Sequence, residues 1–323
     1  MGAEEDSVST GTCRTTSAVP VHFSPLITIP PASSTHRSTI IFLHGRGQTA
    51  EYFHKSLLST AVKGHKTFRD ALPHAKFVFP TAPLMRATKY RRSLIHQWYD
   101  GSGDWEPEAL GNMRDSVEYI HGLVREEIRV LGGDASKLVL AGFSQGCAMA
   151  LTSFLLWEGD AFGAIVGMSG FMPLNSHMTE LLEGAGLDDG DSADGFVFGS
   201  DSSSDPDEPL DQDSGADTPI RQAIKALKEE VELPDSASAS PLSFLETPVF
   251  LGHGTEDPEV EYRHGHLSAN LLEKMGINAQ FHTYEKLQHC LSTDMLTDVA
   301  SFLNNVVKFS SPESDPPTDN DSH

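Results

Sequence analysis

The stretch from Lys137 to Trp157, KLVLAGFSQGCAMALTSFLLW, constrains the fold of this chain more than any other. Its first apolar run, residues 138–143, is typical of a fully buried strand. Its second, residues 147–157, is too long for a strand and rich in Ala, Leu and Met, which favours a buried helix. Between the two runs lies a G-x-S-x-G turn around Ser144, whose flanking glycines leave room for a serine on a strained backbone.

Such a turn lifts the hydroxyl of Ser144 out of the sheet and points the N-terminus of the following helix at it. The backbone amide of Gln145 could then face a developing oxyanion. The pentapeptide alone is weak evidence, and the alternative is a tight turn that carries a surface serine. The strand before it and the helix after it favour the nucleophile interpretation.

Strands and helices alternate along most of the chain. This order predicts a single α/β domain with a mostly parallel sheet and helices on both faces. The predicted strands are 21–29 at an edge, 38–44, 75–79, 138–143, 162–169, 248–252 and 279–284. A first helix is predicted after residue 49, and further helices are predicted at 107–130, 147–157, 265–275 and 293–307. An Arg/Lys-rich loop is expected before residue 92.

We predict a disordered N-terminus over residues 1–18, the domain over 19–310 and a disordered tail over 311–323. The domain is interrupted by an acidic, low-complexity insertion at 184–243, within which 220–233 could form a short helix. The part from Asp188 to Asp217 contains 11 acidic residues and no basic one. It is expected to be solvated and unfolded, with a lid over the site as the alternative.

The formal net charge of −23 argues against a nucleic-acid partner. Three cysteines, Cys13, Cys147 and Cys290, give no disulfide framework and indicate a reducing compartment. Cys147 is expected in the core, and Cys290 is either packed or exposed and modifiable. No secretory signal, myristoylation pattern or run of membrane-spanning length is recognisable. The expected location is therefore the cytoplasm, with the nucleus as a second compartment.

Three polar residues follow predicted strand ends, where the functional groups of parallel sheets gather. Ser144, Asp257 and His289 occur in the chain order of an α/β-hydrolase triad. A serine needs a base to take its proton, a histidine is suited to that role, and a carboxylate fixes the tautomer of the histidine. Glu256 competes with Asp257, which we prefer because Asp-Pro favours a turn that holds the carboxylate still.

The loop after the second strand, HGRG, begins at His44. Its glycines would let backbone amides approach an oxyanion, so we assign the amide of Arg46 as the partner of the Gln145 amide. The alternative is a glycine-rich turn without a ligand. His44 is expected to be structural rather than a second base.

The chain resembles the acyl-protein thioesterases, within the phospholipase/carboxylesterase group of α/β hydrolases. The resemblance covers about residues 38 to 307 and rests on six motifs in order: FLHGRGQTA (42–50), FPTAP (79–83), WYD (98–100), GFSQG (142–146), HGTEDP (253–258) and YEKLQH (284–289). It implies the triad Ser144, Asp257 and His289, with the amides of Arg46 and Gln145 as the oxyanion hole. It also implies that Trp98 lies near the acyl channel.

Three departures from the family pattern make the acyl-chain preference an open question. The acidic block 184–243 stands where the family often has a compact connection. Lys286 stands where glycine is common, and Arg46 replaces a residue that is often apolar beside the acyl site.

The first functional hypothesis is a serine hydrolase that removes palmitoyl groups from protein cysteines through an acyl-enzyme. The second is a general carboxylesterase or lysophospholipase that acts on small esters or lipids. The third, of a different class, is an idle fold whose acidic insertion recruits a basic partner. No cofactor or metal is expected, because no zinc spacing or phosphate-binding glycine loop is present. The expected partners are S-acylated proteins or small acyl esters, without stable insertion into a membrane.

Overall fold

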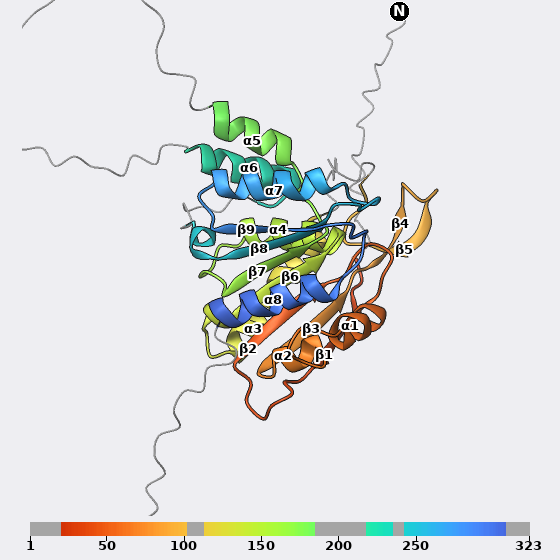
Figure 1. Ribbon diagram of the computed structural model, residues 1–323. Coiled ribbons are helices and arrows are strands. Elements are labelled where there is room, and N and C mark those ends of the chain that lie inside the picture. Colours follow the sequence, from red (N-terminus) through yellow and green to blue (C-terminus); the bar gives the residue numbers. More distant parts are fainter. Residues whose placement is uncertain (1–20, 102–112, 185–217, 235–241, 308–323) are drawn as a thin grey trace, which may run out of the picture.

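A seven-stranded sheet forms the centre of the protein in a computed structural model (Figure 1), which describes residues 21–101, 113–184, 218–234 and 242–307. The strand order is β1-β3-β2-β6-β7-β8-β9. The strands are β1 (Ser24–Ile29), β2 (Ser38–Leu43), β3 (Ala75–Thr81), β6 (Leu138–Phe143), β7 (Ala164–Met168), β8 (Val249–Gly254) and β9 (Ala279–Tyr284). Only β1, at one edge, pairs antiparallel. The mostly parallel sheet predicted from the sequence is confirmed.

Helices cover both faces of the sheet because alternate side chains of each strand point to opposite faces. Ile40 of β2 packs in one apolar cluster, and the next residue, Ile41, packs in the other. The first cluster lies under α1 (Ala50–Ser59), α2 (Phe68–Ala71) and α8 (Thr293–Val306). The second lies under α3 (Arg114–Val130), α4 (Gln145–Leu155), α5 (Asn175–Gly184), α6 (Pro219–Glu230) and α7 (Tyr262–Lys274).

The segment expected as an Arg/Lys-rich loop is instead a β-hairpin, so that prediction is wrong. Strands β4 (Leu84–Ala87) and β5 (Ser93–His96) pair antiparallel and project from the body of the protein (Figure 1). Its turn places Arg91 and Arg92 at φ values of 52° and 61°, and the amide of Ser93 donates to the carbonyl of Tyr90. Two central residues at positive φ define a type I′ turn, which usually carries Asn or Gly, so the sequence lacks the usual signal.

Helix α6 lies inside the range 184–243 that the sequence predicts as an insertion. Its residues Ala223, Ile224 and Leu227 are buried in the second cluster, so this helix is part of the packed domain. Helix α5, which the sequence pattern did not predict, packs against it. The predicted disordered ends, the acidic block 188–217 and the first turns of the helix predicted at 107–130 lie outside the described residues.

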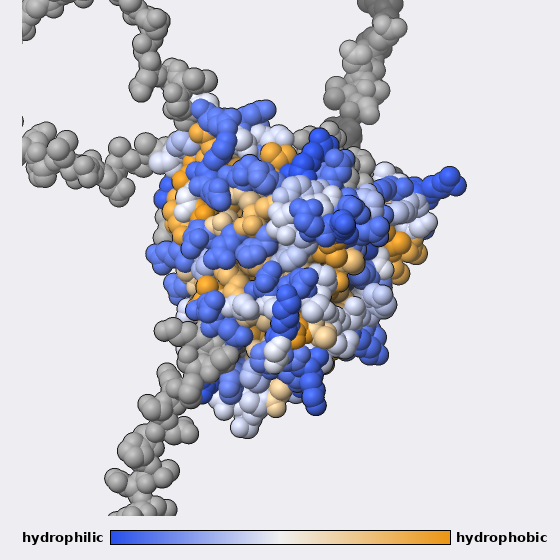
Figure 2. All heavy atoms as spheres, viewed as in Figure 1, coloured by the Kyte–Doolittle hydropathy of each residue, from blue (hydrophilic) through white to orange (hydrophobic). Residues whose placement is uncertain are grey.

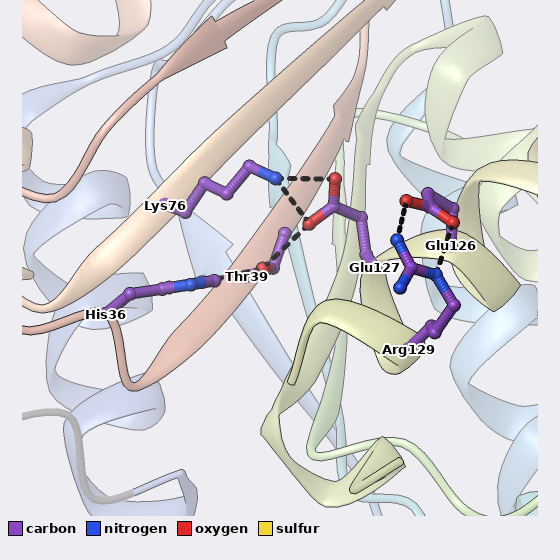
Figure 3. A network of polar contacts seen from close by, with 6 residues as sticks. All are labelled: His36, Thr39, Lys76, Glu126, Glu127 and Arg129. Carbon is purple, nitrogen blue, oxygen red and sulfur yellow. Dashed lines mark hydrogen bonds and ion pairs between the residues drawn. The ribbon is translucent and has the colours of Figure 1, made fainter. Parts of the chain in front are cut away.

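A nearly buried ion pair joins α3 to the sheet at the amino ends of the strands (Figure 3). The ammonium of Lys76 donates to both carboxylate oxygens of Glu127, at 2.7 and 2.8 Å. The hydroxyl of Thr39 donates to the same carboxylate at 3.1 Å. The side chains of Lys76 and Glu127 are 19% and 9% exposed, so little water is available to replace either partner.

Replacing Glu127 by alanine should lower the free energy of unfolding by about 3 kcal/mol, because it leaves the Lys76 ammonium almost buried without its carboxylate. Urea denaturation measures the change. The matched control is Glu126→Ala, since Glu126 pairs with Arg129 on the solvated side of the same helix (Figure 3), where the side chains are 56% and 72% exposed. That control should cost less than about 1 kcal/mol. Equal losses in the two variants would contradict a special role for the Lys76 pair.

Candidate active site

Ser144 occupies the turn between β6 and α4 in a conformation that non-glycine residues rarely adopt. Its φ and ψ are 56° and −123°. The two neighbouring glycines make this turn possible. A Cβ on Gly142 would lie 2.1 Å from the carbonyl oxygen of Gly146, and a Cβ on Gly146 would lie 2.2 Å from the carbonyl oxygen of Leu43. Both positions therefore exclude a side chain, and the half-buried serine is held at the carboxyl end of the sheet.

Asp257 and His289 come together at the same end of the sheet. Nδ1 of His289 lies 2.7 Å from Oδ2 of Asp257, whose side chain is completely buried. The second carboxylate oxygen accepts from the amides of Glu259 and Val260, both at 2.9 Å. Glu256, the competing acid, is exposed. The structure thus brings Asp257 rather than Glu256 to the histidine.

The Asp257 carboxyl is held in its ionised form. Burial acts to raise its pKa, but hydrogen bonds from His253, His289 and the Val260 amide together outweigh burial and bring the pKa well below its usual range. The His253 ring is buried, with Nε2 3.4 Å from Oδ2 of Asp257 and 2.9 Å from the carbonyl oxygen of Val260. A permanent carboxylate at this place suits the partner of a histidine that gains a proton.

The two loops that carry Asp257 and His289 are joined by backbone contacts. The amide of Thr255 donates to the carbonyl of Tyr284, and the amide of Glu256 donates to the carbonyl of Leu287. The amide of Lys286 donates to the hydroxyl of Thr255 at 2.9 Å. Lys286 makes this contact at a φ of 60°, in the left-handed region.

Replacing Lys286 by glycine should raise the free energy of unfolding by about 1 kcal/mol, because glycine adopts a positive φ without the steric cost that a Cβ imposes. The same change at Lys66, an exposed residue outside the positive-φ set, should instead destabilise the protein. Thermal or urea unfolding of both variants measures the difference. A loss of stability in Lys286→Gly that matched Lys66→Gly would rule out relief of backbone strain.

The loop after β2 lies directly against Ser144. A Cβ on Gly45 would be 3.2 Å from the Cβ of Ser144, and the amide of Gly45 donates to Oε1 of Gln48. His44 is fully buried; Nδ1 donates to the carbonyl of Gly45 and Nε2 accepts from the amide of Ala82. Burial lowers the pKa of His44 to about 4, so this ring stays neutral and has a structural role.

The side chain of Gln145 fastens the start of α4 to the segment 98–100. Its Oε1 accepts from the amide of Trp98 at 3.0 Å, and its Nε2 donates to the carbonyl of Tyr99 at 2.8 Å. The indole of Trp98 donates to the carbonyl of His44 at 2.8 Å. Trp98 therefore connects both loops that carry the proposed oxyanion donors. It is 0% exposed and is not among the residues that line the pocket described next, so its expected place near the acyl channel stays a prediction.

A pocket of about 200 Å³ opens beside Ser144 and His289. Its lining combines the predicted residues with several that the sequence did not indicate: Arg46, Lys89, Tyr90, Ser144, Gln145, Phe171, Glu259, Val260 and His289. The ring centroids of Phe143 and His289 lie 4.9 Å apart, so the two rings pack against each other. Lys89 and Tyr90 come from the turn of the unpredicted hairpin, which explains why sequence patterns missed them.

Two cysteines lie near the site in contrasting surroundings. Cys147, in the first turn of α4, is buried, and burial raises the pKa of its thiol to about 12. Cys290 follows His289 and is exposed.

Across the described parts of the chain, no helix is long and apolar enough to cross a membrane. Within the same residues, no three His, Cys, Asp or Glu side chains gather as a metal site would require.

Comparisons with known proteins relate this chain to hydrolases. Residues 26–186 and 226–307 match the phospholipase/carboxylesterase family model. Acyl-protein thioesterase 1 of Debaryomyces hansenii is 25% identical over 88% of this chain and 97% of its own length. The Neurospora crassa protein of the same name is 28% identical over 84% of this chain and 88% of its own length. The crystal structure of Zea mays acyl-protein thioesterase 2 shares the fold, with a TM-score of 0.58 and 21% identity over 88% of this chain and 99% of that one.

Proposed function

The chain belongs to the phospholipase/carboxylesterase family, and we propose that it is a serine hydrolase that removes acyl groups from cysteine thioesters of proteins. The observation that carries this proposal is the hydrogen bond between buried Asp257 and His289, beside the pocket that His289 and Ser144 both line. The names of the curated relatives, acyl-protein thioesterase 1, support the thioester as the bond that is cleaved.

The proposed mechanism follows from the assignment of each nitrogen of His289. With Nδ1 donating to Asp257, Nε2 is left to take the proton of the Ser144 hydroxyl as its oxygen attacks the thioester carbonyl. The carbonyl oxygen becomes an oxyanion between the amides of Arg46 and Gln145. The C–S bond then breaks, and the imidazolium returns its proton to the leaving thiolate. His289 next activates water, which releases the fatty acid and restores Ser144.

The lining of the pocket favours a second candidate within the same chemistry, a carboxylesterase or lysophospholipase that acts on small esters or lipids. The pocket is lined by the charged side chains of Arg46, Lys89 and Glu259, and a long apolar acyl chain gains nothing from contact with them. We retain depalmitoylation in the cytoplasm as the proposal, and chain length is the property that separates the two candidates.

The test is hydrolysis of acyl thioesters and matched oxygen esters from two to sixteen carbons. The proposal expects kcat/KM to rise with chain length and to be higher for thioesters. Activity confined to short oxygen esters would move the protein to the small-ester carboxylesterases. A fluorophosphonate probe that failed to label the protein would count against both candidates and favour an idle fold.

A further inference from the structure

The pocket beside Ser144 carries more positive charge than an apolar acyl chain requires. Arg46 comes from the loop after β2, and Lys89 comes from the turn of the β4–β5 hairpin. Among the described lining residues, the carboxylate is that of Glu259. Glu259 lies in the loop that carries Asp257, and its backbone amide donates to the Asp257 carboxylate. The loop after β2 and the hairpin thus contribute two cations, here called the basic side of the pocket, to a described lining that contains one acid.

The hairpin extends this basic side outward. Residues 84–96 contain Arg86, Lys89, Arg91 and Arg92 and no acid, in a chain whose formal net charge is −23. Figure 2 shows the hairpin tip as a hydrophilic projection from the body of the protein. Lys89 and both arginines of the tip are exposed. At physiological salt the Debye length is about 8 Å, so a substrate at the pocket interacts most strongly with charges within about that distance, such as those of the pocket lining.

Hydrogen bonds fix the hairpin relative to the catalytic loops. The amide of Gly47 donates to the carbonyl of His96 at 2.7 Å, which joins the loop after β2 to β5. The amide and the hydroxyl of Thr88 donate to the carboxylate of Asp100, at 2.9 and 2.5 Å. Because Lys89 follows Thr88 directly, its backbone is held at the pocket. A cation on a fixed backbone can select between substrates, since less order is lost on binding.

We propose that this basic side selects S-acylated peptides in which acidic residues flank the acylated cysteine, and disfavours peptides with basic flanks. The inference rests on the proposed thioesterase function and names its substrate class. The acyl chain is apolar and gains nothing from Arg46 or Lys89. The peptide that carries the thioester remains at the mouth of the pocket, where charged side chains of the substrate would meet Lys89 and the hairpin tip.

The experiment uses two soluble S-octanoyl peptides that differ only in having Glu or Lys on both sides of the cysteine. The full-length protein should hydrolyse the acidic peptide with a kcat/KM about tenfold higher at low salt, and the ratio should approach one in molar salt. Lys89→Glu should lower the ratio about fivefold or more. The matched control is Lys137→Glu, the same change of charge directly before β6, at the opposite end of this strand from Ser144; it should leave the ratio unchanged.

Each result decides between specific alternatives. Equal rates on the two peptides, with thioesterase activity present, would overturn the inference and leave the proposed function standing. No hydrolysis of either peptide would overturn both. A Lys89→Glu effect seen only with a substrate bound to phosphatidylserine vesicles, and absent with soluble peptides, would assign the cations to an anionic lipid surface and would likewise overturn the inference.

Discussion

Replacing Ser144 by alanine should lower kcat on an acyl thioester by about a millionfold, because no other group in the proposed mechanism can form the acyl-enzyme. The fold should be retained, since alanine keeps the Cβ and the turn depends on its neighbours Gly142 and Gly146. Hydrolysis of the best substrate from the chain-length series measures the loss. Labelling by a fluorophosphonate should disappear in the same variant.

The control for this substitution is Ser56→Ala, at an exposed position in the middle of α1. It should retain wild-type activity and labelling. A Ser144→Ala protein that is folded, by circular dichroism and thermal unfolding, and still hydrolyses thioesters would mean that the nucleophile lies elsewhere. A variant that loses activity together with its fold would be compared with Ser144→Cys, which keeps a nucleophile at the same place and should still be labelled by a thiol-reactive acyl analogue.

Replacing Asp257 by asparagine should lower kcat by about 10⁴-fold while leaving most of the fold intact. The amide can present an N–H group to Nδ1 of His289, which favours the tautomer whose proton is on Nε2, and this tautomer cannot accept the proton of Ser144. The asparagine also lacks the negative charge that stabilises the imidazolium. Steady-state kinetics measure the loss.

The control is Glu256→Gln, the same chemical change on the exposed neighbouring residue. It should alter kcat by less than about twofold, because a solvated surface charge contributes little. If Glu256→Gln caused the larger loss, the acid of the triad would have to be reassigned. If both variants remained fully active, His289 would not depend on a carboxylate partner.

Asp257 should also make stability depend on pH in the acid range. Its pKa in the folded protein lies below its ordinary value of about 3.9, so the unfolded state binds the proton more tightly. The carboxylate therefore stabilises the fold above the ordinary pKa, and this contribution is lost as the pH falls toward the lower pKa of the folded state. The free energy of unfolding of Asp257→Asn should vary less with pH below about 4 than that of the wild type.

Sequence patterns predicted the main elements of the site because each of these elements carries a local signal. The buried strand β6, the small residues around Ser144 and the long apolar helix α4 are all recognisable within one stretch, and alternation of strands and helices implies a parallel sheet. The order of Ser144, Asp257 and His289 after three strands then predicts their meeting, because the carboxyl ends of parallel strands lie at one edge.

The contacts of Trp98 are a feature of the site that local sequence patterns do not predict. The resemblance to a family indicated that the WYD segment matters but not what it contacts. In the structure the three polar groups of Trp98 are all used inside the protein: its amide by Gln145, its indole by His44 and its carbonyl by the hydroxyl of Ser116. Each partner is far from Trp98 in the sequence, so spacing cannot reveal that the side chain supports the site.

The sequence by itself thus determined the sheet, its two helical layers and the three residues proposed as the triad, because hydrophobic period and glycine placement act within a few residues of the chain. The tertiary structure alone decided the hairpin, the buried Lys76–Glu127 pair and the basic lining of the pocket. Those features depend on contacts between distant segments. In the hairpin, a type I′ turn built from two arginines carries no local signal, and only pairing of β4 with β5 places Lys89 beside Ser144.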